Sequence, residues 1–465
     1  MPPKTIALIV VAMAMGSLPC VRADEIETPL QPALTEIAAA VQPEPLRATI
    51  SHLVGFGTRH TMSTTTSRTR GIGAARRWVQ SRFEAISKDC RGCLHVVTPA
   101  QSFTGKRLAA PTEVMDIVAI QPGTSDQQRV VLITGHLDSR VTDVMNATSD
   151  APGANDDGSG VAAVLEAARV LSRHRFAATI VYGALSGEEQ GLYGGKVLAQ
   201  YARAQHWQVE ADLNNDIIGN SHGGDGVRDA RTVRVFSEGT KSVETAEQAG
   251  HRRYNGGEVD SPSRNVARFI ATLAPRYVSE LDVHMVYRTD RYGRGGDQVE
   301  FLGAGYPAVR LTEGHENYTR QHQDLRVEDG ITYGDRIEGV DFEYLARITR
   351  LNAVTLAALA SAPMPPAGVS IEGAVSSDTT VKWTPVPGAA GYRVWWRDTT
   401  APQWQHSVVV PGGSTSDTVL KRVVIDDWFF GVSSVSADGF ESPVAFPGDP
   451  GSFVSVLPAE SSARQ

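Results

Sequence analysis

The sequence predicts an α/β protein with a mostly parallel or mixed sheet, helices on both faces of that sheet, and an all-β sandwich at the C-terminus. Three observations predict this arrangement. Short apolar runs alternate with helical periodicity through most of the chain, which is typical of strands joined by crossover helices. A proline-rich stretch at residues 361–367 ends the alternation. Beyond it, short β runs are separated by Pro, Gly, Ser and Asp.

The chain of 465 residues is too long for a single hydrophobic core. Its hydrophobic content of 41% and charged content of 21% are ordinary for a soluble globular protein. The formal net charge of −8 gives no indication of a nucleic acid partner. We expect an α/β domain at 24–360, a linker at 361–367, a sandwich at 368–455 and a tail at 456–465.

Residues 1–23 have the pattern of a secretory signal peptide. Lys4 precedes an apolar run over residues 5–18, and small residues stand before the expected cleavage site after Ala23. A membrane anchor is less favoured, because about 14 apolar residues are too few to cross a bilayer. Pro19 disfavours a lipoprotein signal at Cys20. We therefore expect export to the periplasm or the medium, without stable membrane insertion.

Two cysteines, Cys90 and Cys93, remain after this cleavage. In an oxidising compartment their spacing favours a local disulfide. Half of a zinc site is disfavoured, because no other thiols complete a set of four. A redox-active pair is a further alternative.

Five short runs rich in apolar and β-branched residues predict buried strands. They lie at 130–134, 178–182, 209–213, 232–236 and 308–311. Helical spacing predicts helices at 71–86, 160–171, 194–203 and 342–360. Beyond the linker lie five of the seven tryptophans, enough aromatic bulk for an independent core. The runs 380–383, 391–396 and 430–435 resemble a fibronectin type III sandwich, whose binding partner the sequence does not indicate.

Clusters of histidine or acidic residues follow several predicted strands. In an open α/β sheet, ligands bind beyond the carboxyl ends of the strands, so we expect these clusters to converge. The first contains His136 and Asp138. His136 is a candidate metal ligand, and Asp138 a candidate to orient it or a neighbouring ligand. Alone, such a pair more often belongs to an ordinary surface or capping arrangement.

Asp156 lies in a glycine-rich segment at 153–160 that leads into a predicted helix. Such a segment is typical of a turn or a helix N-cap. A calcium loop fits badly, because its ligands alternate along the chain whereas these carboxylates are adjacent. A carboxylate on this turn is also a candidate to bridge two metal ions.

Glu188 and Glu189 follow the predicted strand at 178–182. Ser186 and Glu189 have the spacing of a capping box, which would only satisfy backbone donors. Alternatively, one glutamate holds a metal ion while the other reaches a water molecule. That division suits metal-assisted hydrolysis.

Asp216 after the 209–213 strand and His322 after the 308–311 strand complete the set. Seen alone, each is more typical of a solvated loop. Together the clusters offer two histidines and three carboxylates as ligands, with one glutamate left as a base. Nitrogen and oxygen ligands without thiolate favour zinc, with cobalt or manganese as possible substitutes.

In their residues and in their order along the chain, these segments resemble the co-catalytic two-zinc aminopeptidase family, which includes secreted bacterial leucyl aminopeptidases. The resemblance runs from Ile50 to Leu359. It implies a zinc-dependent exopeptidase fold with two zinc ions per chain and peptides or protein N-termini as substrates. It also implies a cis peptide bond between Asp156 and Asp157.

The same resemblance assigns the site residues. One zinc ion takes His136 and Asp216, the other takes Glu189 and His322, and Asp156 bridges the two. Glu188 is then the general base, and Asp138 the orienting carboxylate.

Two segments depart from the family pattern. The family commonly has His-x-x-x-Asp at the last ligand, whereas this chain has His322-x-Asp, so His315 stays an alternative ligand. The usual Ser-Asp-His appears as Gly-Asp-Gln at 296–298. Tyr292 and Arg294 lie just before it, in a region where related enzymes contact the substrate, and the sequence does not choose between them.

The expected activity is hydrolysis of N-terminal peptide bonds. One rival is a metallocarboxypeptidase or dipeptidase, in which Arg294 would bind a terminal carboxylate. Another is a glutaminyl cyclase with a single zinc ion. A third is a binding protein that has lost its metals, against which the complete ligand set argues.

Overall fold

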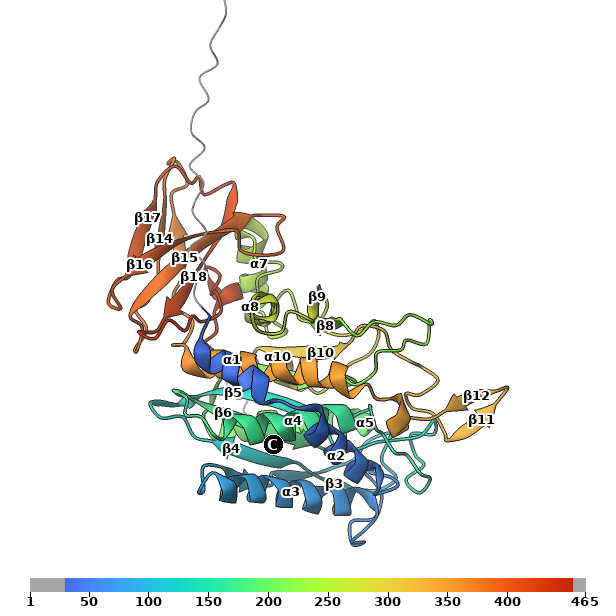
Figure 1. Cartoon of the computed structure of the whole chain (residues 1–465). Coiled ribbons are helices and arrows are strands. Elements are labelled where there is room, and N and C mark those ends of the chain that lie inside the picture. Colours follow the sequence, from blue (N-terminus) through green and yellow to red (C-terminus); the bar gives the residue numbers. More distant parts are fainter. Residues whose placement is uncertain (1–29, 455–465) are drawn as a thin grey trace, which may run out of the picture. The chain divides into compact units, whose positions relative to one another are not determined.

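The structure is a computed structural model that describes residues 30–454, so the predicted signal peptide and tail lie outside the described residues. An eight-stranded mixed sheet in the order β1-β4-β6-β5-β7-β10-β8-β9 forms its centre (Figure 1). Its strands are β1 (His95–Val97), β4 (Ile117–Gln121), β5 (Asp126–His136), β6 (Ala178–Leu185), β7 (Gln208–Asn215), β8 (Thr232–Phe236), β9 (Asp282–Val286) and β10 (Ala308–Glu313). A separate pair, β2 (Ala100–Phe103) and β3 (Thr112–Met115), is antiparallel.

Strands β5, β6, β7 and β10 run parallel, whereas β1, β4 and β8 pair antiparallel with their neighbours β4, β6 and β10. The carboxyl ends of the four parallel strands therefore meet at one edge. Every residue of β6 is buried, as expected for a central strand with both faces covered. The predicted mixed α/β sheet is confirmed.

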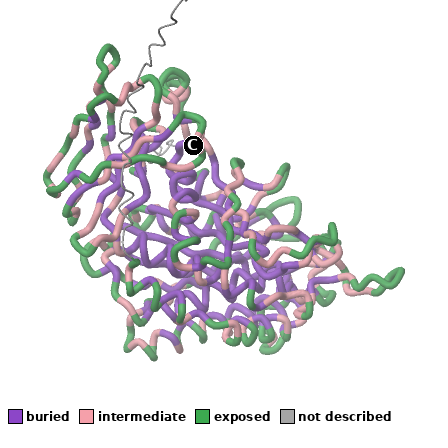
Figure 2. The backbone as a smooth tube through the Cα atoms, turned by 45° about the horizontal axis from the view of Figure 1, so that its top comes forward, coloured by how far each residue is buried: buried purple, intermediate pink, exposed green. Residues whose placement is uncertain are grey.

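Helices cover both faces of this sheet. On one face α4 and α10 contact β5 and β6, and on the other α6 and α9 contact β6, β7 and β10. The buried chain segments concentrate between these layers (Figure 2). The helices are α1 (Pro32–Ala40), α2 (Pro43–Val54), α3 (Gly71–Asp89), α4 (Gly158–Leu171), α5 (Glu188–Gly191), α6 (Tyr193–Ala204), α7 (Ala246–Asn255), α8 (Pro262–Tyr277), α9 (Gln298–Gly303) and α10 (Phe342–Ser361). Within residues 30–454, no helix combines the length and apolarity that crossing a membrane requires.

The C-terminal strands form two three-stranded antiparallel sheets, β13-β14-β17 and β16-β15-β18. Their bounds are β13 (Ser370–Glu372), β14 (Thr379–Lys382), β15 (Gly391–Asp398), β16 (His406–Pro411), β17 (Asp417–Leu420) and β18 (Trp428–Val435). Trp383 packs against Tyr392 at a ring separation of 5.1 Å. This core is continuous with that of the α/β part, and the described residues from 31 onward form one compact unit. The fibronectin type III assignment stays a prediction.

A buried ion cluster joins the sandwich to the α/β part. Asp260 precedes α8, Arg268 lies on α8, and Arg397 lies on β15. One Asp260 oxygen accepts from Arg268 Nη1 and Arg397 Nη2, both at 2.8 Å, and the other accepts from Arg397 Nη2 at 2.9 Å. All three side chains are at most 2% exposed. Water cannot solvate charges that are buried this deeply, so each of them needs the opposite charge beside it.

A short hairpin, β11 (Arg326–Glu328) and β12 (Ile331–Tyr333), projects beyond the edge where the parallel strands end (Figure 1). Asp329 and Gly330 both have positive φ, at 52° and 78°, which is the type I′ turn that closes two-residue hairpins. At its base, the Gly334 backbone N–H donates to Thr319 O at 3.0 Å. His322 stands before the hairpin and Asp335 just after it.

Cys90 and Cys93 form the predicted disulfide at the C-terminal end of α3. Cys90 is the C-cap residue of that helix. The negative end of the helix dipole lies there, which disfavours a thiolate. A local structural cross-link therefore suits this pair better than redox chemistry.

Candidate metal centre

The structure brings all five predicted ligands together at the carboxyl ends of the parallel strands. His136 is the last residue of β5, Asp216 directly follows β7, and His322 lies in the loop after β10. Asp156 and Glu189 come from the loop before α4 and from α5. They form two groups that could each hold a metal ion, His136-Asp156-Asp216 and Asp156-Glu189-His322.

Asp156 belongs to both groups because its two oxygens face different histidines. Its Oδ1 lies 3.1 Å from His136 Nε2, and its Oδ2 lies 2.9 Å from His322 Nε2. The Asp156-Asp157 peptide bond is cis, which confirms the expectation from the family resemblance. The geometry is that of a carboxylate able to bridge two cations.

The helix N-cap that the sequence of the same segment indicated is Asp157. Its Oδ1 accepts from the Gly160 backbone at 2.9 Å and caps α4, and its Oδ2 accepts from the His136 backbone at 2.9 Å. The two adjacent aspartates therefore differ in role. Asp157 organises the backbone, which leaves Asp156 for the metal centre.

The capping-box interpretation of Ser186 and Glu189 is wrong. The N-cap of α5 is Gly187, and no side chain caps it. Ser186 Oγ instead donates to Met115 O at 2.7 Å. Glu189 Oε2 accepts from Arg140 Nε at 2.9 Å, while its buried Oε1 lies 3.0 Å from His322 Nε2. A buried carboxylate oxygen and an imidazole nitrogen at this separation suit a cation that both could bind.

Asp138 organises the start of α5 as well as His136. Its carboxylate accepts from the Glu188 and Glu189 backbone N–H groups at 3.3 and 3.2 Å, and from Thr61 Oγ1 at 2.9 Å. His136 Nδ1 lies 3.7 Å from this carboxylate but 3.0 Å from the Asp138 backbone carbonyl. The carbonyl is therefore the nearer orienting group for the imidazole.

Sequence reasoning missed three residues that contact the candidate ligands. Arg310 Nη1 donates to Asp216 Oδ2 at 2.5 Å, and Arg140 contacts both Glu189 and His322. Asp335 accepts from the Asp156 backbone N–H at 2.7 Å. Arg310 did leave a signal, because it is a charged residue inside an otherwise apolar buried strand. Nothing local in the sequence marks Asp335.

Electrostatics separate the ligands from the proposed base. Burial alone would raise the pKa of Asp156 and of Asp216. The charge of His322 instead holds the pKa of Asp156 below its usual range, and Arg310 does the same for the pKa of Asp216. Burial raises the pKa of Glu188 to about 8, with His136 opposing this shift and Glu189 adding to it. A divalent cation beside Glu188 would lower this value. These carboxylates are thus ionised ligands beside a more basic glutamate.

The alternative residues considered beside the two departing segments, and Asp297, lie outside both ligand groups. His315 Nδ1 pairs with Asp225 at 2.8 Å and joins no metal-binding group among the described residues. Tyr292 is 87% exposed, and Arg294 Nη1 donates to Glu316 at 2.8 Å. Asp297 is buried and accepts from the Gly195 backbone N–H at 2.9 Å.

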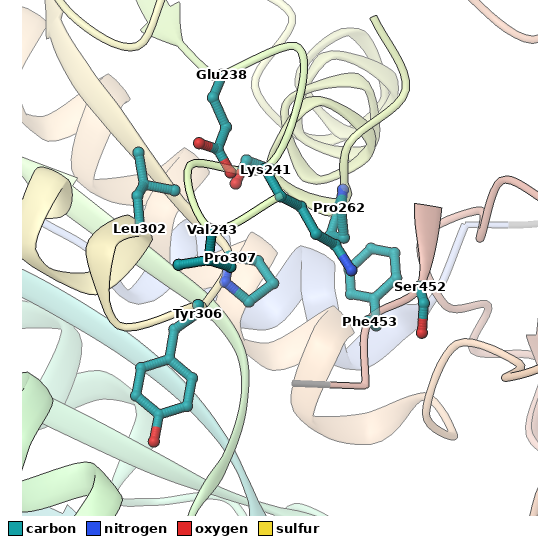
Figure 3. A pocket seen from close by; sticks show the side chains of 11 residues that line it. Glu238, Lys241, Val243, Pro262, Leu302, Tyr306, Pro307, Ser452 and Phe453 are labelled. Carbon is teal, nitrogen blue, oxygen red and sulfur yellow. The ribbon is translucent and has the colours of Figure 1, made fainter. Parts of the chain in front are cut away.

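Of two small cavities in the described part of the chain, one borders this centre. The cavity that does not is lined by residues that include Lys241, Pro307 and Phe453 (Figure 3). Pro307 directly precedes β10, whereas the ligands gather beyond the last residue of that strand. This cavity contains no predicted site residue. The other is a polar recess lined by residues that include Asp156, Gln321 and Asp335, and so it borders the metal centre.

The fold and this site define a hydrolase of the metal-dependent α/β class. Residues 116–329 match the model of peptidase family M28. A probable zinc metalloprotease of Pyrenophora teres f. teres is 44% identical over 88% of this chain and 85% of its own length. Another, from Leptosphaeria maculans, is 44% identical over 90% of this chain and 97% of its own length. The chain belongs to the same family as these zinc metalloproteases, and its match to peptidase family M28 agrees with the predicted enzyme class, which is confirmed.

Solved structures agree at the level of fold. The crystal structure of the Legionella pneumophila LapA aminopeptidase matches with a TM-score of 0.51 at 18% identity, covering 72% of this chain and 76% of that chain. LapB from the same organism matches with a TM-score of 0.50 at 18% identity, covering 71% and 76%.

Proposed function

We propose that this chain is an exported aminopeptidase that hydrolyses N-terminal peptide bonds with two zinc ions. The observation that carries the proposal is Asp156, whose two oxygens face one histidine each. His136 and Asp216 would hold one ion, and Glu189 and His322 the other. The close approach of Glu189 Oε1 to His322 Nε2, at 3.0 Å, and a donor set of nitrogen and oxygen fit zinc.

When bound, the zinc ions would supply Lewis acidity that polarises the scissile carbonyl and makes water more acidic. The proton transfers then fall to Glu188. Glu188 is only partly buried, and none of the described residues hydrogen-bonds to its carboxylate. Its backbone is fixed through Asp138. We assign to it removal of the proton from water and its delivery to the leaving amine.

A carboxypeptidase or dipeptidase is the second candidate, favoured by one observation. Arg234, Arg291 and Arg294 all contact Glu316, so cationic groups outnumber the carboxylate that they share. The side chain of Arg294 is 33% exposed and has donors to spare for a terminal carboxylate.

A substrate panel separates the two candidates. We expect hydrolysis of aminoacyl-anilides and of C-terminally blocked peptides, because neither offers a free carboxylate. A zinc chelator should abolish this activity, and added zinc should restore it. Cleavage confined to N-terminally blocked peptides with a free C-terminus would instead establish a carboxypeptidase.

The metal content and the export of the chain can be measured together. Native mass spectrometry of protein recovered outside the producing cells should show two zinc ions per chain. The denatured mass should correspond to a chain that begins at or after Asp24 and is two hydrogens lighter than the reduced form. Active protein with at most one tightly bound ion would contradict the two-metal assignment, and a retained N-terminal segment would contradict signal cleavage.

A further inference from the structure

Arg140 contacts both protein ligands of the second metal group. Its Nε donates to Glu189 Oε2 at 2.9 Å, and its Nη2 lies 2.6 Å from His322 Nδ1. Its Nη1 lies 3.3 Å from Thr142 O in the same loop. The side chain is only 16% exposed, so the guanidinium is held between the two ligands.

The contact with His322 sets a guanidinium donor against Nδ1, while Nε2 faces Asp156 and Glu189. A guanidinium only donates, so this contact is a hydrogen bond only when Nδ1 carries no hydrogen. Ligation of a metal ion by Nε2 uses the lone pair of that nitrogen, which leaves the hydrogen of the imidazole on Nδ1. An N–H at Nδ1 cannot face a guanidinium donor.

The first group has the opposite arrangement. His136 Nδ1 lies 3.0 Å from the Asp138 backbone carbonyl, which is an acceptor. A hydrogen on Nδ1 fits this acceptor, so ligation through Nε2 would leave the Nδ1 contact unchanged. Arg310 bonds Asp216 Oδ2, as Arg140 bonds Glu189 Oε2, but no described hydrogen bond joins Arg310 to His136. A metal ion in this group would therefore displace no guanidinium from its histidine.

We propose that Arg140 is a positioning residue that makes the two metal sites unequal. A metal ion fills the His136 group first, whereas an ion at the second group has to displace Arg140 Nη2 from His322. Nε can keep its bond to Glu189 Oε2 and hold that carboxylate with Oε1 turned toward the ion. The inference rests on the proposed function, because it takes the ligand assignment from there.

The test is a zinc titration against a chromophoric chelator, using the full chain stripped of metal. Wild-type protein should bind zinc in two separate steps. In Arg140→Gln the side-chain oxygen can accept from His322 Nδ1, so the second Kd should tighten about tenfold or more, since hydrogen bonds to charged groups change equilibria by about that much. The first Kd should stay within about twofold, because the ligands that Arg140 contacts belong to the second group. Arg140→Met, which neither donates nor accepts, should also tighten the second step, by less.

Arg107→Gln is the matched control. Arg107 Nη1 donates to the backbone oxygen of Glu189 at 3.0 Å, so this variant removes a neighbouring positive charge without touching His322. Its two steps should match the wild type. Equal tightening in Arg107→Gln would show that the effect comes from the loss of any nearby positive charge, which would overturn the proposal. An unchanged or weaker second step in both Arg140 variants would overturn it as well. Wild-type protein that binds at most one zinc ion would instead defeat the two-metal function, and this inference with it.

Discussion

Replacing Glu188 by glutamine should lower kcat by about 10²–10⁴-fold while both zinc ions stay bound, because general-base catalysis is worth about that much. Glutamine keeps the size of the side chain but cannot take a proton from water. The backbone of residue 188 stays fixed by Asp138, so the geometry of the ligands should not change. Turnover of an aminoacyl-anilide and zinc content, measured on the same preparation, check both statements.

The neighbouring change, Glu189→Gln, is the matched comparison. It removes a charged candidate ligand whose Oε1 lies 3.0 Å from His322 Nε2. Zinc affinity should therefore fall together with activity, whereas Glu188→Gln separates the two. Near-normal turnover by zinc-loaded Glu188→Gln protein would rule out Glu188 as the base.

Asp260→Asn should lower the free energy of unfolding by about 3–5 kcal/mol, the usual cost of removing one partner from a buried ion pair. The change leaves Arg268 and Arg397 facing one another with no compensating charge, because Asp260 accepts from both. Urea unfolding at saturating zinc measures the effect. A single transition is expected, because the sandwich and the α/β part share one core.

Lys382→Ala supplies the control. The Lys382–Glu372 pair lies in the same sandwich at 2.7 Å, but its side chains are 43% and 62% exposed. Exposed pairs contribute about 0–1 kcal/mol, so this variant should unfold close to the wild type. Two separate transitions would show that the sandwich folds independently, as the tryptophans beyond the linker suggest from the sequence. A loss in Asp260→Asn no larger than in the control would show that the ion cluster does not stabilise the fold.

Much of the α/β part was predictable because its central strands are buried on both faces and stand out as apolar runs. The predicted strand at 232–236 coincides with β8, and those at 130–134 and 178–182 lie within β5 and β6. Strands β1 and β4 and helices α7 to α9 were not identified. Helix α7 shows why, since none of its residues is buried and its sequence therefore lacks an apolar stripe.

The candidate ligands were predictable because each follows a strand and matches an ordered motif. Their partners were not, because contacts such as Arg140–His322 join segments that are 182 residues apart. The capping-box spacing failed for a local reason. Gly187 caps α5 with positive φ, at 78°, so Ser186 lies outside the helix and Glu189 lies beside His322.

Because the β11–β12 hairpin is closed at its base and exposed at its tip, residues 329–330 are a suitable place to insert a tag or a fluorophore. Doubling the length of a flexible loop costs only about 0.6 kcal/mol, so an insertion in this turn should be tolerated. The flanking chain leads to His322 on one side and to Asp335, beneath Asp156, on the other. A label at the tip would therefore be carried by a short hairpin whose base lies beside both metal groups, where it could report the binding of metal ions in real time.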